Sequence, residues 1–335
     1  MKNHLIKKTK KAFSLIEVIF VLVILGIVAS ISSQIIVQVY ENYIMQRAIY
    51  NVSTKTELTA NQIVNRLGYR IQGTTISKKH LNFLASKTSF DAGTGNTVVP
   101  DDWLPLEDVP TGSQYTTIEW IGYDNDSFAA NVTPNWSGIA NYETNASING
   151  FESPGSTLNN VATIMTNLSN GKVDLTNANP AAVIFAEDND YYNKTDEYSP
   201  LCMGLVPELV GSSTNCIFPV EQNTTTSFNF TRNRDANNTL RPKIITERYK
   251  LAWSAYAIAP EDPDGDGLHD LALYSNYQPW NNESYLTGQR NILMRNVTVF
   301  KFSESGGVIT FKLCASENIG QDFNVTTCKQ KVVIR

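Results

Sequence analysis

The stretch KKAFSLIEVIFVLVILGIVA, residues 10–29, joins two lysines to an apolar run that contains one acid, Glu17. Within residues 13–31 the only polar side chains are those of Ser14, Glu17 and Ser30. As a helix this segment would span about 28 Å, close to the hydrocarbon thickness of a bilayer. A carboxylate in lipid costs roughly 2.5–3.5 kcal/mol, so the chain needs a physical reason to keep Glu17.

Helical periodicity continues well beyond the apolar run. Apolar and small residues recur at three- and four-residue steps: Ile49, Val52, Thr56, Ala60, Ile63 and Leu67. No proline occurs before Pro100, and no glycine lies between Gly26 and Gly68. The pattern predicts one helix over residues 13–67, about 80 Å long, with a transmembrane part at 13–31. Gly68 is its expected end.

The first twelve residues carry five lysines and no acid. By the positive-inside rule, this asymmetry places the N-terminus in the cytoplasm and the body of the chain outside. A basic segment before an apolar one is also typical of an ordinary secretory signal peptide, which would be cut after Ala29. The acid at Glu17 and the continuous helix count against that alternative, which predicts a mature N-terminus near residue 30.

This N-terminus closely resembles the class III leader and first helix of type IV pilins and type II secretion pseudopilins. The shared pattern is a short basic leader, a small residue, Phe, Ser, Leu, Ile, Glu and then unbroken apolar residues. The resemblance implies that a prepilin peptidase removes residues 1–12 by cutting between Ala12 and Phe13, and that the new Phe13 amine is methylated. It also assigns Glu17 to assembly, because the Phe13 amine of a neighbouring subunit can neutralise its charge.

The sequence departs from the family pattern at two positions. Ala12 replaces the usual Gly, and Gln34 stands where many major pilins have a helix-kinking Pro. The second departure favours a minor pilin or pseudopilin over a principal filament subunit. A run at Leu293, Val297, Phe300 and Phe302 loosely resembles J-class minor pseudopilins and W-class minor pilins.

The resemblance also implies a location and a set of partners. The expected place is the bacterial inner membrane, with a single pass, a cytoplasmic N-terminus and a periplasmic or extracellular body. The expected partners are other pilin subunits, the prepilin peptidase and an inner-membrane assembly platform. The expected function is that of a minor subunit at or near the tip of a type II secretion pseudopilus or type IV pilus.

Strand patterns dominate the body, residues 68–335. Alternating or apolar segments predict strands at YTTIEWIGY (115–123), YKLAWSAYAIA (249–259), LALYS (271–275), ILMRNVTVFKF (292–302), VITFKLC (308–314) and TTCKQKVVIR (326–335). Packed on the C-terminal half of the helix, such a meander is the α+β fold that the pilin resemblance implies. Residues 124–240 are rich in Asn, Ser, Thr and Gly, and predict a loop-rich insertion with short strands such as AAVIFAE (181–187).

Four cysteines form two pairs of equal spacing, Cys202 with Cys216 and Cys314 with Cys328. An even number of cysteines in a chain that leaves the cytosol predicts two disulfides. Cys314 and Cys328 lie symmetrically about a polar connection, so an antiparallel strand pair would place them opposite each other. Free buried thiols remain the alternative.

An acidic loop, EDPDGDGLHDLAL at 261–273, has the spacing of a calcium site. Asp262, Asp264 and Asp266 occupy the first, third and fifth places, Leu268 offers a carbonyl, and Asp270 occupies the ninth. Leu273 replaces the bidentate Glu of an EF-hand, so the loop resembles strand–loop–strand calcium sites instead. We expect Ca²⁺ with a structural role; the alternative is a solvated acidic turn.

Nothing in the sequence predicts catalysis. The three histidines, His4, His80 and His269, have no Cys or Ser in a triad-like spacing. Removal of the leader takes the formal charge from −5 to −10, which argues against nucleic-acid binding. The alternative to an assembly role is therefore a filament-displayed adhesin or substrate-binding head, with the insertion contacting a secreted substrate or a surface ligand.

Overall fold

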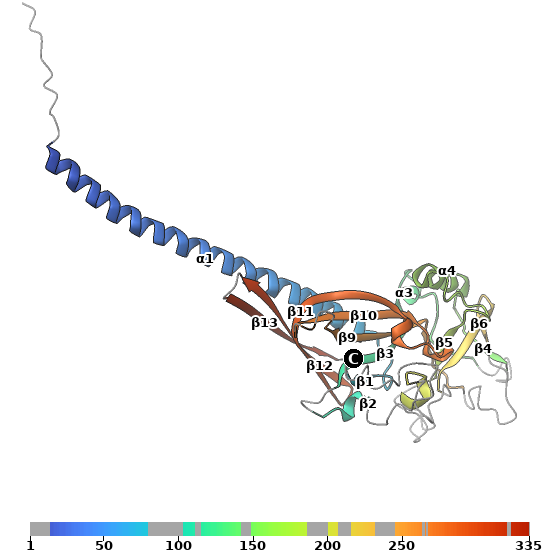
Figure 1. Ribbon diagram of the computed structural model, residues 1–335. Coiled ribbons are helices and arrows are strands. Elements are labelled where there is room, and N and C mark those ends of the chain that lie inside the picture. The colour runs from blue at the N-terminus through green and yellow to red at the C-terminus, as the bar shows by residue number, and fades with distance from the viewer. Residues whose placement is uncertain are drawn as a thin grey trace, which may run out of the picture.

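The computed structural model describes residues 14–79, 103–110, 115–141, 149–185, 200–206, 216–231, 245–262, 265, 267–319 and 323–334. Within these ranges the chain forms one long helix, a large antiparallel sheet and a smaller sheet (Figure 1). The α+β class expected from the sequence is confirmed.

The long helix α1 spans Leu15–Gly68, and its two halves have different surroundings. None of the described residues before Ala48 is buried, so the first half projects away from the body (Figure 1). In the second half the predicted three- and four-residue period is confirmed, because the buried positions are Ala48, Val52, Thr56, Thr59, Ala60, Ile63 and Leu67. Ile49, which the pattern included, is 43% exposed, so this one position departs from the predicted buried face.

The large sheet has eight antiparallel strands among the described residues, and it covers the second half of α1. In chain order the strands are β1 (Ile76–Lys79), β2 (Trp103–Pro105), β3 (Tyr115–Gly122), β9 (Ser254–Glu261), β10 (His269–Tyr277), β11 (Gln289–Ser305), β12 (Val308–Ile319) and β13 (Phe323–Val333). Their spatial order is β13-β12-β11-β10-β9-β3-β1-β2. The predicted C-terminal meander is therefore confirmed, with α1 packed chiefly on β13 and β12.

The sheet divides along β11. The first half of this strand, up to Val297, pairs with β10, and the second half, from Val297 to Ser305, pairs with β12. The strands β12 and β13 thus form a ribbon with the end of β11, and short helix η3 (Leu106–Asp108) contacts that strand. One core of apolar side chains lies between α1 and this divided sheet.

The chain leaves the large sheet between Gly122 and Ser254, which lie directly opposite each other on β3 and β9. The intervening residues, 123–253, are called the lobe. Its sheet has the order β4-β7-β6-β5-β8, with strands β4 (Gly150–Glu152), β5 (Ala181–Ile184), β6 (Phe218–Thr224), β7 (Ser227–Phe230) and β8 (Lys250–Ala252). Its helical segments are α3 (Asn125–Phe128), α4 (Leu158–Ser169) and η4 (Pro200–Met203).

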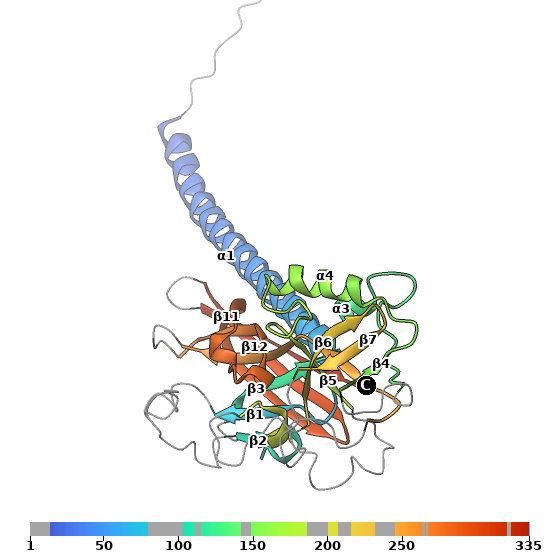
Figure 2. The ribbon, with the colours of Figure 1, turned by 90° about the vertical axis from the view of Figure 1, so that its right-hand side faces the viewer.

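The lobe lies at the end of the molecule opposite the N-terminus of α1 (Figure 1), with α4 beside its sheet (Figure 2). An aromatic-rich core fills the lobe, and a second core is shared between the lobe and the large sheet. Two more single-turn helices, η5 (Pro279–Asn281) and η6 (Tyr285–Thr287), follow β10. The lobe is therefore packed on the large sheet, and the predicted domain boundaries remain predictions.

Two local expectations were wrong. The region expected to hold loops and short strands also contains α4, whose buried residues Leu158, Val161, Met165 and Ser169 follow a helical period. The segment 249–259, expected as one strand, is divided at Trp253 into β8 and β9, which belong to different sheets. Alternation alone does not distinguish one strand from two strands joined by a bend.

Candidate functional site

The first turn of α1 holds the acid that the sequence singled out. Ser14 has extended backbone (φ −67°, ψ 140°), and its carbonyl accepts hydrogen bonds from the amides of Glu17 (3.0 Å) and Val18 (3.2 Å). A carboxylate in the first helical turn interacts favourably with the helix dipole. Glu17 itself is exposed, and Ala12 and Phe13 lie outside the described residues.

The exposed half of α1 is apolar enough to enter a membrane. An 18-residue window has a mean hydropathy of 2.8, and none of it is buried within the structure. Large apolar side chains are exposed along this whole half, from Leu15 at 80% to Tyr43 at 59%. Exposed apolar surface of this extent marks a membrane or protein contact.

The apolar surface extends further than a bilayer requires. A helix needs about 20 residues to cross the hydrocarbon core. Yet Ile35, Ile36, Val39, Tyr40 and Tyr43 lie beyond the predicted transmembrane part and remain more than half exposed. Between them stand polar residues such as Gln38 and Glu41. This second segment therefore suits contact with other protein surfaces.

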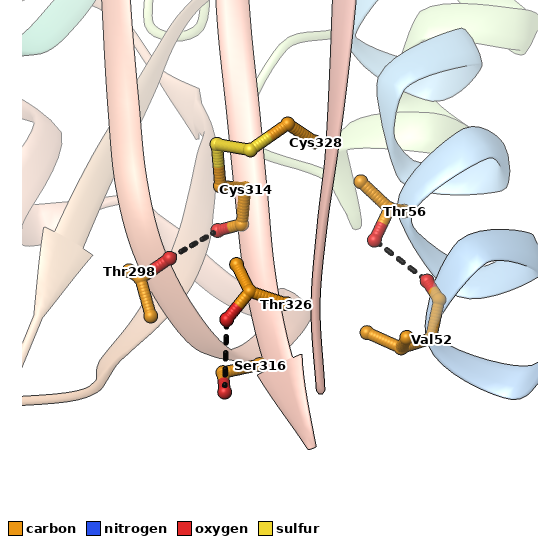
Figure 3. The surroundings of a disulfide bond; sticks show 7 residues. All are labelled: Val52, Thr56, Thr298, Cys314, Ser316, Thr326 and Cys328. Carbon is orange, nitrogen blue, oxygen red and sulfur yellow. Dashed lines mark hydrogen bonds between the residues drawn. A yellow bond between two sulfur atoms is a disulfide. The ribbon is translucent and has the colours of Figure 1, made fainter. Parts of the chain in front are cut away.

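A disulfide lies beside the packed half of α1. Cys314 on β12 and Cys328 on β13 are directly opposite, with Cα atoms 4.0 Å apart, and they are bonded. Figure 3 shows this bridge near Val52 and Thr56 of α1. The hydroxyl of Thr56 donates to the carbonyl of Val52 (2.6 Å), so it is satisfied within the helix. The bridge ties together the two strands on which α1 rests.

The second disulfide joins Cys202 and Cys216 in the lobe. The amide of Cys216 also donates to the carbonyl of Cys202 (3.1 Å). No described cysteine is free. Two disulfides suit an oxidising compartment outside the cytosol.

The acidic loop is described only in part. Asp262 accepts hydrogen bonds from the amides of Gly265 (2.8 Å) and Gly267 (3.2 Å), and both glycines have positive φ. Asp270 is opposite Glu261 in the β9–β10 pair. Asp264 and Asp266 lie outside the described residues. Within the described part of the chain, no group of three or more potential metal ligands is found.

The other candidate residues are dispersed. His269 falls within the stretch 261–273 that we expected to be an acidic loop, but it begins strand β10 opposite Val297 and is half-buried. His80 lies outside the described residues. The absence of catalytic activity remains a prediction.

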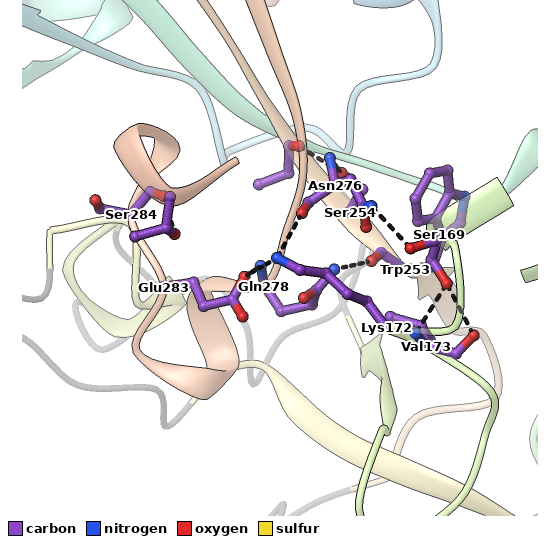
Figure 4. A network of polar contacts seen from close by, with 11 residues as sticks. Ser169, Lys172, Val173, Trp253, Ser254, Asn276, Gln278, Glu283 and Ser284 are labelled. Atoms are coloured by element: carbon purple, nitrogen blue, oxygen red, sulfur yellow. Dashed lines mark hydrogen bonds and ion pairs between the residues drawn. The ribbon is translucent and has the colours of Figure 1, made fainter. Parts of the chain in front are cut away.

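A junction that the sequence did not reveal fixes the lobe on the large sheet (Figure 4). At its centre the side-chain amide of Asn276, on β10, donates to the carbonyl of Ser169, at the end of α4 (2.9 Å). Lys172 donates to the carbonyl of Asn276 (3.2 Å) and pairs with Glu283 (3.4 Å). The backbone amide of Asn276 donates to the hydroxyl of Ser254 (2.8 Å). Asn276 has a φ of +58°, which Asn tolerates better than most residues.

Comparison with known proteins gives one match. Residues 7–33 match the family model of the prokaryotic N-terminal methylation motif. No curated protein and no solved structure matches the chain. This motif, at the start of a membrane-length helix whose second half packs against an antiparallel sheet, supports membership of the type IV pilin and pseudopilin family and processing by prepilin peptidase.

Proposed function

We propose that this chain is a minor pilin or pseudopilin subunit that assembles through α1 at or near the tip of a type II secretion pseudopilus or type IV pilus. The observation that supports assembly best is the exposed apolar surface of α1 beyond the length that a bilayer covers. Before assembly, the first part of α1 anchors the subunit in the inner membrane, with the N-terminus in the cytoplasm and the body outside.

Glu17 has a specific role in this proposal. Cleavage after Ala12 would leave a charged amine on Phe13, four residues before Glu17. An unpaired carboxylate is costly in lipid, and the Phe13 amine of a neighbouring subunit would neutralise it. Glu17 thereby favours association over the isolated membrane-embedded state.

The position of the lobe supports a place at the tip. A subunit inside a head-to-tail filament has neighbours at both ends. Here the lobe occupies the end of the molecule opposite the N-terminus of α1 (Figure 1). A subunit at the tip needs no contact above it, so it can carry such a lobe without blocking growth below.

Substitution of Glu17 tests the assembly role. In Glu17→Ala we expect unchanged recovery in the membrane fraction and at least a tenfold loss of partner subunits on co-purification. Asp126→Ala is the control, because Asp126 is an exposed acid in the lobe and lies outside α1. Equal recovery of partners with Glu17→Ala and Asp126→Ala would contradict the role of Glu17.

The mature N-terminus tests processing. N-terminal sequencing and mass spectrometry of protein from its native membrane should find N-methylated Phe13. A mature chain that begins near residue 30 would instead establish an ordinary signal peptide and remove the basis for assembly through α1.

A filament-displayed adhesin or substrate-binding head is the second candidate, and the separate sheet and core of the lobe favour it. Because Gly122 and Ser254 are opposite each other, a short turn can replace residues 123–253 and join β3 to β9 directly. If the lobe recognises a ligand, filaments should still form while adhesion or secretion specificity is lost. Unchanged adhesion and secretion would count against this candidate.

We also propose that the acidic loop is a structural calcium site. Carboxylate and carbonyl oxygens are the ligands that Ca²⁺ prefers, and a positive-φ glycine supplies the sharp turn such loops need. The turn at Gly265 and Gly267 around Asp262 has this character. Asp262, Asp264, Asp266, Asp270 and the carbonyl of Leu268 would hold the ion, which would link β9 to β10.

A further inference from the structure

A pocket that the assembly role does not use lies beside the second half of β11, with both polar and apolar lining residues. Its volume is about 230 Å³, and its polar lining comprises Tyr115, Lys301, Ser303, Thr310, Lys312 and Gln330. Val109 and Phe302 contribute apolar wall. Pockets for drug-sized ligands are about 300–1,000 Å³, so this one suits a smaller molecule.

The two lysines of this pocket face each other across neighbouring strands. Lys301 on β11 is directly opposite Lys312 on β12, and Gln330 on β13 is opposite Lys312. Like charges directly opposite in an antiparallel pair are destabilising. A bound anion between the two ammonium groups would reverse the sign of that interaction.

The part of the chain that the structure describes does not neutralise these lysines. Among the described residues, neither Lys301 nor Lys312 takes part in an ion pair or a hydrogen bond through its side chain. Glu304 lies on the other face of β11 from Lys301, by strand alternation. Burial raises the pKa of Glu304, and its charged neighbours are Arg70 and Glu107.

The rest of the lining adds groups that recognise hydroxyls. Ser303, Thr310, Tyr115 and Gln330 offer hydroxyl and amide groups, and each can donate or accept. The ammonium of Lys79 lies 5.6 Å from the centroid of the Tyr115 ring, which places a third cation near the pocket. In a body with a formal charge of −10 after loss of the leader, Lys301 and Lys312 form a local concentration of positive charge.

We propose that this pocket binds a sugar acid, with its carboxylate between Lys301 and Lys312 and its hydroxyls on the surrounding polar side chains. The apolar wall would contact the ring face. The ligand could arrive as a free monosaccharide or as a unit of an acidic polysaccharide. The proposal is independent of the position of the subunit in a filament.

Titration of the full-length protein in detergent with galacturonate, observed by calorimetry or NMR, tests the proposal. Galactose and inorganic phosphate are the comparison probes, and oligogalacturonate distinguishes a polymer unit from a free sugar. We expect binding of galacturonate and at least a tenfold weakening in both Lys301→Gln and Lys312→Gln. Lys55→Gln, at an exposed position on α1, should bind like the wild type.

The variants also report on folding. Each lysine replacement removes a like-charge contact, so its melting temperature without ligand should equal or exceed that of the wild type. Weakened binding in a folded variant supports the pocket. No binding of galacturonate, equal binding by all variants, or phosphate binding as tight as that of galacturonate would each overturn the proposal.

Discussion

Asp124 carries a carboxylate that the fold encloses at the start of the lobe, where it is 1% exposed. Its side chain accepts hydrogen bonds from the amide of Ser127 (3.0 Å) and from the hydroxyl of the same residue. Its carbonyl accepts from the indole of Trp136 (3.0 Å), and its amide donates to the carbonyl of Leu251 (2.7 Å). Burial raises the pKa of Asp124 from 3.8 to about 7, and the nearby charge of Asp126 adds to this increase.

This shift predicts a pH dependence of stability. Because the folded pKa lies above the ordinary value, the free energy of unfolding should fall as pH rises from about 4 to about 7, by at most about 1.4 kcal/mol per unit. Asp124→Asn keeps the helix cap and removes the titration. Melting at pH 5 and pH 8 should show a smaller decrease for Asp124→Asn than for the wild type, whereas Asp108→Asn, at an exposed acid at the end of η3, should keep the wild-type decrease. Equal decreases in all three would contradict the assignment.

Lys78 and Glu119 form a second buried polar centre, an ion pair of 2.6 Å with both side chains at most 3% exposed. Lys78 also donates to the carbonyl of Leu205 (2.7 Å), and the hydroxyl of Tyr277 donates to Glu119 (2.9 Å). The pair therefore links β1 and β3 to the segment that follows η4 in the lobe.

Removal of Lys78 alone should lower the free energy of unfolding more than removal of both charges of the pair. Lys78→Met should lower the free energy of unfolding by about 3–5 kcal/mol, because it leaves Glu119 buried without its cation. Adding Glu119→Gln, which retains an acceptor for Tyr277, should recover part of that loss. Lys172→Met, which breaks the partly exposed pair with Glu283, should cost about 1 kcal/mol or less. Denaturant titration measures the free energy of unfolding of all three variants. A double variant less stable than Lys78→Met would refute this account.

At the scale of elements, the β9–β10 connection joins two central strands of the large sheet. Four acidic side chains in nine residues repel one another unless a cation lies between them. An ion there would hold the ends of β9 and β10 together and would stabilise the folded state in proportion to its occupancy.

A chelator should therefore lower the melting temperature of the wild type by several degrees, and added Ca²⁺ should restore it. Asp262→Ala should abolish this response. Asp174→Ala is the control, because Asp174 also accepts hydrogen bonds within a turn, from Thr176 and Asn179, but has no acidic cluster around it. If the chelator leaves the melting temperature of the wild type unchanged, the loop is a solvated acidic turn and not a calcium site.

At the scale of the whole molecule, the two halves of α1 lie in different environments. Its first half contributes no buried residue to the body, whereas its second half supplies one side of the core under β12 and β13. The body should therefore be stable without the membrane segment.

A chain that begins at Ile44 should be soluble without detergent and should melt within about 2 °C of the full-length protein, since it keeps every described buried residue of α1. A chain that begins at Thr56 loses Ala48 and Val52 and should melt at a clearly lower temperature. A large loss of stability in the longer fragment would show that the first half of α1 stabilises the body.

Much of this fold was predictable because its patterns are local. The membrane segment, the continuation of α1 to about residue 67 and the strands of the C-terminal meander all follow from side-chain periodicity. The opposition of Cys314 and Cys328 follows from a hairpin centred between them. The helix α4 was missed because its Asn and Thr residues favour turns, although Leu158, Val161 and Met165 lie on one face.

The sequence by itself determined the long apolar helix, its methylation motif and the C-terminal meander of strands, because each depends on residues close together in the chain. The tertiary structure alone decided that residues 250–252 pair with residues 182–184 in the lobe. It alone placed Lys78 beside Glu119 and brought Tyr115 to the pocket of Lys301 and Lys312. These contacts depend on packing between segments that are tens to hundreds of residues apart, and no local pattern of polarity encodes them.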